Sequence, residues 1–296
     1  MATIELYDDA ADFLRDARDH LAQDPVLSTV VASVAEREVV EGPTPDPDLP
    51  HWYAVARDES GDVVGVAMRT APFAPHPLFV LPMPGSAAVA LARLLHDRGE
   101  QVAGANGALP AVRVLADETA RLGGGAVSVR MHTRLFELRT VREPRRPAGA
   151  LRVATEADLY LAVAWFEAFH HDADEQAGRR SGHKAEAVTR DAVRSRVQDG
   201  RVFLWEVDGL PVHLTGRNPT SYGASRIGPV FTPQEHRGCG YAGATVAEVS
   251  RRILHEGARP CVFTDQANPV SNRVYERIGY EAVVDMVNLL LGPPTS

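Results

Sequence analysis

The segment Thr232-Pro-Gln-Glu-His-Arg-Gly-Cys-Gly-Tyr-Ala242 decides the fold of this chain. It follows an apolar run at Arg226–Phe231, which predicts a strand, and it leads into Tyr241–His255, whose apolar residues recur with the period of a helix. Gly238 and Gly240 allow the backbone to turn so that several N–H groups face one point, beside the positive end of the helix dipole. The segment therefore predicts a cradle for an anion, most naturally a pyrophosphate.

Two other interpretations of this loop are open. A glycine-containing turn capped by Arg237 would need no ligand. The glycines at 238, 240 and 243 also match the spacing GxGxxG, and Asp265 follows a second predicted strand, a pattern typical of a nicotinamide-dinucleotide site. In that site the first glycine follows its strand almost directly, whereas residues 232–237 intervene here. Too few residues follow the loop for the remaining parallel strands, so the dinucleotide interpretation is disfavoured.

A second segment, Asn268-Pro-Val-Ser-Asn-Arg-Val-Tyr-Glu-Arg-Ile-Gly-Tyr280, lies downstream. Together the two segments resemble the GNAT superfamily of N-acetyltransferases, which pairs a Gln/Arg-x-x-Gly-x-Gly/Ala loop with a downstream Asn and a helix carrying aliphatic-Tyr and Gly-aromatic positions. The resemblance covers roughly residues 151–291. One departure is that Glu235 occupies the Gln/Arg position, so that Arg237 supplies the nearest positive charge.

The resemblance implies that acetyl-CoA is a co-substrate. Its pantetheine arm would pair with the end of the strand, where Gly228 and Pro229 could break the ladder to a neighbouring strand. Its pyrophosphate would lie in the cradle. The cofactor-binding residues that the resemblance implies are Val230, Phe231, Thr232, Arg237, Gly238, Cys239, Gly240, Tyr241, Ala242, Asn268 and Ser271.

Tyr275 is the main catalytic candidate, because a phenol near the thioester sulfur can protonate the thiolate that leaves. Core packing is the competing role, since its neighbours mark an apolar helix face. The attacking amine, with a pKa of about 10.4, must first lose a proton. Glu167 and Glu206 are the carboxylate candidates for the base, and the other candidates are His170, His171, Asp172 and His213.

The predicted activity is transfer of an acetyl group from acetyl-CoA to a primary amine, on a small molecule or a protein, by direct attack. A non-catalytic acyl-CoA-binding or sensing module is the alternative. The residues do not identify the acceptor, the length of the acyl group or the oligomeric state.

Composition narrows the classes of partner. The 39 acidic and 31 basic residues among 296 give a net charge of −8, which predicts no nucleic-acid or membrane partner. Two cysteines and an N-terminus unlike a signal peptide predict a soluble, cytoplasmic protein. His170–Glu175 has i,i+4 pairs of metal-binding residue types, but a third ligand at a recognisable spacing is lacking, and we expect no metal.

The Pro- and Arg-rich stretch 140–150 is a predicted linker between a domain at 1–139 and a catalytic domain at 151–296. Both halves alternate strands and helices in a similar order, which predicts an α/β protein of tandem GNAT-like domains, each a mixed, mostly antiparallel sheet flanked by helices. At the position of the cradle the first half has Phe79–Ser86, with one glycine and two prolines, and we expect it not to bind acyl-CoA.

In the second half the predicted elements are a capped helix from Thr155, a helix at 184–198, a hairpin at 202–207 and 212–215, strands at 226–231, 261–264 and 282–290, and helices at 241–255 and 270–278. In the first half they are a hairpin at 52–57 and 63–70, a helix at 86–97, a strand at 101–104 and a helix from Pro110 to Leu122.

Overall fold

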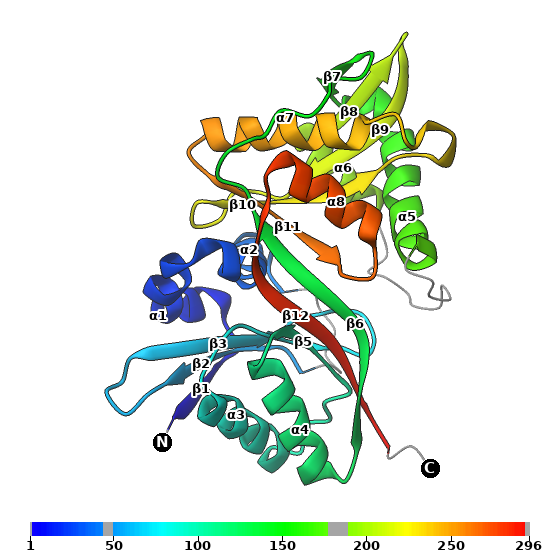
Figure 1. Cartoon of the computed structure of the whole chain (residues 1–296). Helices are drawn as coiled ribbons and strands as arrows, with labels where there is room; N and C mark the ends of the chain where they lie inside the picture. The colour runs from blue at the N-terminus through cyan, green and yellow to red at the C-terminus, as the bar shows by residue number, and fades with distance from the viewer. Residues whose placement is uncertain (1, 44–49, 177–188, 294–296) are drawn as a thin grey trace. The chain divides into compact units, whose positions relative to one another are not determined.

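The computed structural model describes residues 2–43, 50–176 and 189–293, and gives only the backbone for 170–176. The chain divides into two compact units, one of Met1–Leu135 with Val284–Ser296 and the other of Phe136–Val283. Each unit is a mixed sheet flanked by helices, as the sequence predicts (Figure 1).

Unit 2, Phe136–Val283, contains the predicted cradle segment, residues 232–242. Its strands follow the order β11-β10-β9-β8-β7. Only β10 and β11 are parallel among these neighbours, and the other pairs are antiparallel. The bounds are β7 Ala150–Val153, β8 Val202–Val207, β9 Leu210–Arg217, β10 Ala224–Phe231 and β11 Arg259–Asp265. The helices are η1 Glu156–Asp158, α5 Leu159–Gln176, α6 Arg190–Gln198, η2 Gln234–His236, α7 Tyr241–His255 and α8 Pro269–Ile278.

Local signals in the sequence place several of these elements. Asp208 and Gly209 adopt positive φ angles of 49° and 80° and close the β8–β9 hairpin. The predicted capping box is confirmed, since the Thr155 N–H donates to the Asp158 carboxylate at 2.8 Å ahead of α5. Gly279 ends α8 in the left-handed region, with φ of 109°.

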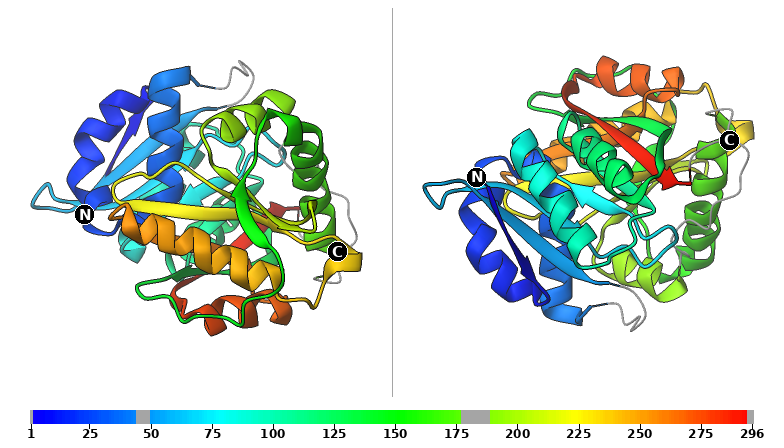
Figure 2. Two further views of the ribbon diagram at one scale, coloured as in Figure 1. Left: turned by 90° about the horizontal axis from the view of Figure 1, so that it is seen from above. Right: turned by 90° about the horizontal axis from the view of Figure 1, so that it is seen from below.

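Two apolar layers cover the two faces of the unit 2 sheet. Phe203 and Ile227 pack with the buried face of α7 and with Tyr275 of α8. Leu204, the neighbour of Phe203, points to the other face and packs with α5 and α6. This alternation is the period of a strand. Helix α7 runs along the strands on its side of the sheet (Figure 2).

Unit 1 has the strand order β1-β2-β3-β4-β5-β12-β6. Again one neighbouring pair, β4–β5, is parallel. Helices α3 and α4 pack side by side over a buried apolar cluster. The strands are β1 Thr3–Tyr7, β2 Trp52–Arg57, β3 Val63–Arg69, β4 Leu78–Val80, β5 Gly104–Ala108, β6 Ala126–Glu137 and β12 Glu281–Gly292. The helices are α1 Ala10–Gln23, α2 Pro25–Glu41, α3 Gly85–Asp97 and α4 Ala111–Gly123.

Two details differ from the sequence expectations. Strand β12, predicted at 282–290 and grouped with the second half, pairs with β5 from Met286 opposite Ala108 to Leu290 opposite Gly104, and so belongs to unit 1 from Val284 onward. The strand predicted at 101–104 is wrong, because the strand starts at Gly104 and runs through Asn106 to Ala108. Residues 138–149, between β6 and β7, form neither helix nor strand, and they lie within unit 2.

Strands β4 and β5 approach each other closely. All three residues of β4 are paired with β5, ending with Val80 opposite Gly107. A Cβ atom at position 107 would lie only 2.1 Å from the Val80 carbonyl oxygen. The parallel pair of unit 1 is therefore closed along the whole length of β4.

Replacing Gly107 by Ala should destabilise the chain by roughly 1–3 kcal/mol, because the added methyl group has no space between the two strands. Gly123→Ala, at the end of α4 where nothing lies within 4 Å of the new Cβ, is the matched control and should change stability by less than about 1 kcal/mol. Urea denaturation of both variants measures the difference. Equal stability of the two variants would contradict the close approach.

Candidate active site

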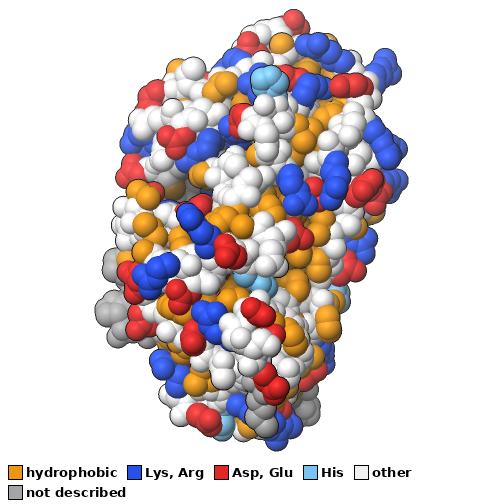
Figure 3. Space-filling model, turned by 90° about the vertical axis from the view of Figure 1, so that its left-hand side faces the viewer, with side chains coloured by type: hydrophobic (Ala, Val, Ile, Leu, Met, Phe, Trp, Pro, Cys, Tyr) orange, Lys and Arg blue, Asp and Glu red, His pale blue; other side chains and the backbone are white. Residues whose placement is uncertain are grey.

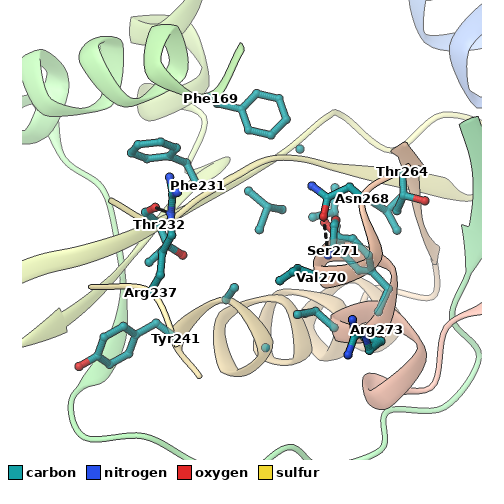
Figure 4. A pocket seen from close by; sticks show the side chains of 18 of the residues that line it. Phe169, Phe231, Thr232, Arg237, Tyr241, Thr264, Asn268, Val270, Ser271 and Arg273 are labelled. Atoms are coloured by element: carbon teal, nitrogen blue, oxygen red, sulfur yellow. Dashed lines mark hydrogen bonds between the residues drawn. The ribbon is translucent and has the colours of Figure 1, made fainter. Parts of the chain in front are cut away.

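A cavity of about 530 Å³ lies in unit 2, where β10 and β11 diverge in front of the first turns of α7 and α8. Figure 4 shows its walls, with Phe231, Thr232 and Arg237 on one side and the side chains of α8 on the other. The predicted cradle loop, the end of β10 and the α8 helix therefore line the same cavity.

The divergence of the two strands creates the cavity. They pair only from Ala224 opposite Arg259 to Arg226 opposite Cys261. On the other side of β10 the register to β9 shifts between Ile227 and Val230, which confirms the ladder break expected at Gly228–Pro229. Beyond the paired residues both strands line the cavity: Ile227, Gly228, Val230 and Phe231 from β10, and Val262, Phe263, Thr264 and Asp265 from β11.

The loop after β10 has the geometry of an anion cradle. Gly238 and Gly240 take φ angles of 78° and 88°, which an L side chain rarely adopts. Gly240 is the N-cap of α7, with no side chain to bond the free N–H groups of the first turn. Arg237 Nε donates to the carbonyl oxygen of Thr232 at 3.0 Å and so ties the loop together. The start of this 15-residue helix therefore faces the cavity with unsatisfied donors and a positive dipole end.

The structure brings all but one of the residues predicted to bind the cofactor into this cavity. Those that line it are Val230, Phe231, Thr232, Arg237, Gly238, Gly240, Tyr241, Ala242, Asn268 and Ser271. Cys239 is not among the lining residues and is exposed, with its Sγ 3.7 Å from the Arg237 carbonyl oxygen. Asn268 Oδ1 accepts from the N–H of Ser271 at 3.0 Å, so this side chain also caps α8.

Tyr275 projects from α8 to the cavity and is 5% exposed. Burial raises its pKa to about 12, and a hydrogen bond with Ser271 acts in the opposite direction. Its ring packs edge-on against Tyr280, with the centroids 5.6 Å apart. The phenol therefore keeps its proton near neutral pH, while its ring forms part of the core, and both roles considered for it have a geometric basis.

Solved structures with this arrangement cover nearly the whole chain. An acetyltransferase from the GNAT family of Colwellia psychrerythraea is 10% identical, with 98% of this chain and 99% of that chain covered at a TM-score of 0.58. A GCN5-related N-acetyltransferase from Sphaerobacter thermophilus is 17% identical, with 97% and 94% covered at a TM-score of 0.57. A Drosophila protein reaches 0.65 at 14% identity, with 98% of each chain covered. The chain has the fold of these GNAT structures.

The sequence comparisons are narrower. Residues 207–288, which include the cradle and α8, match the model of the family described as FR47-like protein. The search of curated proteins returned no match. The GNAT resemblance of the second half is therefore confirmed at the level of the fold.

The two glutamates expected to act as base lie elsewhere. Glu167 is exposed on α5 and is not among the residues that line the cavity. Glu206 accepts a hydrogen bond from Arg152 Nε, and Arg152 also pairs with Asp158 at 2.7 Å. Among the described residues that line the cavity, Asp265 provides the only carboxylate, and its Oδ1 accepts from the N–H of Ala267 at 2.9 Å.

His213, another residue in the wider set for the base, is fully buried on β9. Its Nδ1 lies 2.7 Å from the Thr232 hydroxyl, and its Nε2 lies 2.8 Å from the Thr215 hydroxyl. Burial lowers its pKa to about 3. The imidazole is therefore neutral and already bonded at both nitrogens, which removes it as a direct base for an acceptor in the cavity.

Sequence reasoning missed three kinds of lining residue. Arg273 and Arg277 extend along the exposed edge of α8 beside the cavity, and His236 comes from the cradle loop. Arg273 and Arg277 are four residues apart, which places them on one side of a helix, and this spacing is visible in the sequence. Phe169 of α5 faces the cavity near Phe231 (Figure 4). Nothing in its own neighbourhood of the sequence indicates this contact.

The other site hypotheses fall partly outside the described residues. The side chains of His170, His171, Asp172 and the rest of His170–Glu175 belong to this excluded part. Across the described residues, no group of three or more His, Cys, Asp or Glu side chains is arranged to hold a metal ion. Among the described residues, no helix has both the length and the apolar character needed to cross a bilayer.

The buried His213 predicts a specific pH dependence of stability. Its pKa is about 3 in the folded chain and about 6.5 in the unfolded chain, so the unfolded state binds more protons between these values. The free energy of unfolding should therefore fall as the pH drops below about 6.5, by up to about 1.4 kcal/mol per unit from this residue.

Urea denaturation at pH 7, 6 and 5 measures this slope. His213→Gln should show a shallower slope than the wild type, whereas His255→Gln, which replaces an exposed imidazole at the end of α7, should leave it unchanged. Identical slopes for His213→Gln and wild type would contradict the buried, neutral state of His213.

Proposed function

We propose that unit 2 is an acetyl-CoA-dependent N-acetyltransferase that transfers the acetyl group to a primary amine, on a small molecule or a protein, by direct attack. The observation that carries this proposal is the opening between β10 and β11 directly beside the α7 cradle. A strand edge for an extended arm and an anion site for a pyrophosphate thus lie in one cavity.

The positive groups of the cavity suit the anionic end of acetyl-CoA. The N-terminus of α7 and Arg237 would hold the pyrophosphate. Arg273 and Arg277, on the exposed edge of α8, supply two further cations for phosphate groups at the rim. Acidic and basic side chains are interspersed on the face shown in Figure 3.

The chemistry follows from the position of the exposed strand edge. The amine nitrogen attacks the thioester carbonyl carbon, a C–N bond forms and the C–S bond breaks. Backbone N–H groups left unpaired where β10 departs from β11 are suited to stabilise the oxygen anion that develops. Tyr275, whose pKa is raised, gives its proton to the departing thiolate. The mechanism requires no covalent intermediate on the chain.

Proton removal from the acceptor ammonium needs a base or an anion nearby. Asp265, at the end of β11, provides the only carboxylate among the described lining residues and is therefore our candidate for the base. Glu167 is exposed and lies two residues before Phe169, which does line the cavity, so it stays a candidate. Glu206 is engaged by Arg152 and is the weaker of the two glutamate candidates.

Unit 1 is proposed not to bind acyl-CoA. Its β4 is paired with β5 through its last residue, whereas β10 continues for five residues beyond its last pair with β11. Met83 lies in the loop that corresponds to the cradle and packs tightly on β3. A Cβ atom added at Gly65 would lie 2.3 Å from the Cβ atom of Met83. Asp58 and Glu59 share a surface cavity with Pro84 and Ser86 at the start of α3. Carboxylates at that place would repel a phosphate.

Calorimetric titration with acetyl-CoA should give one site per chain, and Gly238→Asp should weaken binding roughly 10-fold or more by placing an anion in the cradle. Gly257→Asp is a closely matched control. Both glycines have almost the same φ, 78° and 79°, and nothing lies within 4 Å of a Cβ built on either. The control therefore carries the same backbone strain and the same charge without the cradle.

Equal weakening in both variants would show that strain, not position, causes the effect. Two sites per chain would overturn the proposal for unit 1, and no binding to the wild type would overturn the proposed function.

Tyr275→Phe should lower turnover about 100-fold while the dissociation constant for acetyl-CoA changes less than about 3-fold, because only the proton donor is lost. Acceptor-independent hydrolysis of acetyl-CoA, followed by thiol release, measures turnover without a known amine. Unchanged hydrolysis in the variant would refute the role of Tyr275. Tight binding with no hydrolysis by the wild type would favour the alternative, an acyl-CoA-sensing module, for which the position of Tyr275 in the apolar core also argues.

A further inference from the structure

The hydrogen-bonded group Thr215–His213–Thr232 connects the buried middle of the unit 2 sheet to the cavity. Thr215 and His213 are both 0% exposed on β9, and Thr232 lines the cavity directly after β10. The two bonds measure 2.8 Å and 2.7 Å. Three polar side chains thus occupy a place in the sheet that apolar residues could fill, and only Thr232 reaches the ligand space.

A neutral imidazole has one nitrogen that donates and one that accepts. The two threonine hydroxyls must therefore have opposite roles. If Nδ1 carries the proton, it donates to Thr232 Oγ1, and the Thr232 hydroxyl keeps its own proton for a partner in the cavity. If Nε2 carries the proton, Thr232 must donate to Nδ1 and can present only lone pairs to the cavity. The tautomer of His213 decides whether Thr232 is a donor or an acceptor.

The anionic character of the proposed ligand selects between the two arrangements. Thr232 stands between the strand edge proposed for the pantetheine arm and the cradle proposed for the pyrophosphate. A phosphate oxygen at that junction accepts hydrogen bonds and donates none, so a hydroxyl that presents only lone pairs would be repelled. Arg237 holds the main-chain carbonyl of the same residue. Both ends of Thr232 are thus fixed.

We propose that His213 is a positioning residue that, as the Nδ1–H tautomer, orients the Thr232 hydroxyl to donate to a phosphate oxygen of the acyl-CoA. In this arrangement the Thr215 hydroxyl donates to Nε2. The inference rests on the proposed acyl-CoA site and extends it to two residues that do not touch the ligand. Burial keeps the pKa of His213 far below neutral, so this arrangement persists throughout the physiological pH range.

The test combines a double-mutant cycle with rescue. His213→Leu removes both ring nitrogens, and Thr232→Val removes the hydroxyl. Each should raise the dissociation constants of acetyl-CoA and of free CoA by the same factor, about 10-fold. The double variant should be no worse than Thr232→Val alone, because His213 acts only through that hydroxyl. His213→Asn, whose amide nitrogen can take the place of Nδ1, should restore binding to within about 3-fold of wild type.

A merely structural role predicts a different pattern. In that case weakening would follow the loss of thermal stability in each variant, the two substitutions would add, and His213→Asn would rescue nothing. The imidazole ¹⁵N resonances provide an independent readout, and a proton on Nε2 instead of Nδ1 would overturn the inference. Normal binding of acetyl-CoA by His213→Leu would overturn it while leaving the proposed function intact, whereas no binding by the wild type would overturn both.

Discussion

The parallel pairing of β10 with β11 lasts for only three residues on each strand, and the site in unit 2 depends on where it stops. A strand that leaves its neighbour exposes backbone donors and acceptors that need partners. The β9 side of β10 stays paired at Val230 and Phe231, so the strand is held on one edge and open on the other. The cavity therefore opens where the pairing of β10 with β11 stops, and residues of α7 and α8 line it.

Unit 1 repeats the architecture without this opening. Its short β4 is paired throughout, and Gly107 allows the two strands to approach closely at Val80, the last residue of β4. The same order of elements therefore supports a cavity in one unit and a closed sheet in the other. The difference lies in a few residues at the parallel pair and in the following loop, which explains why a fold alone does not assign an activity.

Signals that act over a few residues were predictable. The bounds of α7, the β8–β9 turn and the caps of α5 and α8 follow from glycine, proline and capping patterns. Strand β5, Gly-Ala-Asn-Gly-Ala, has weak intrinsic strand preference and exists because β4 and β12 pair with it from both sides. Likewise, the partner of Glu206 depends on the register of β7 with β8, which places Arg152 nearby and which no local pattern reveals.

Two buried side chains, Tyr275 at the cavity and His213 behind Thr232, share one electrostatic property. Burial raises the pKa of Tyr275 and lowers that of His213, so each is held in its neutral form on both sides of pH 7. In these neutral forms neither side chain carries the cost of a buried charge. The permanent positive charges, Arg237, Arg273 and Arg277, sit at the exposed side of the cradle and of α8 instead. A separation of charged binding groups from neutral reacting groups is what a site needs if it is to hold phosphates tightly and still bring an uncharged amine to a thioester.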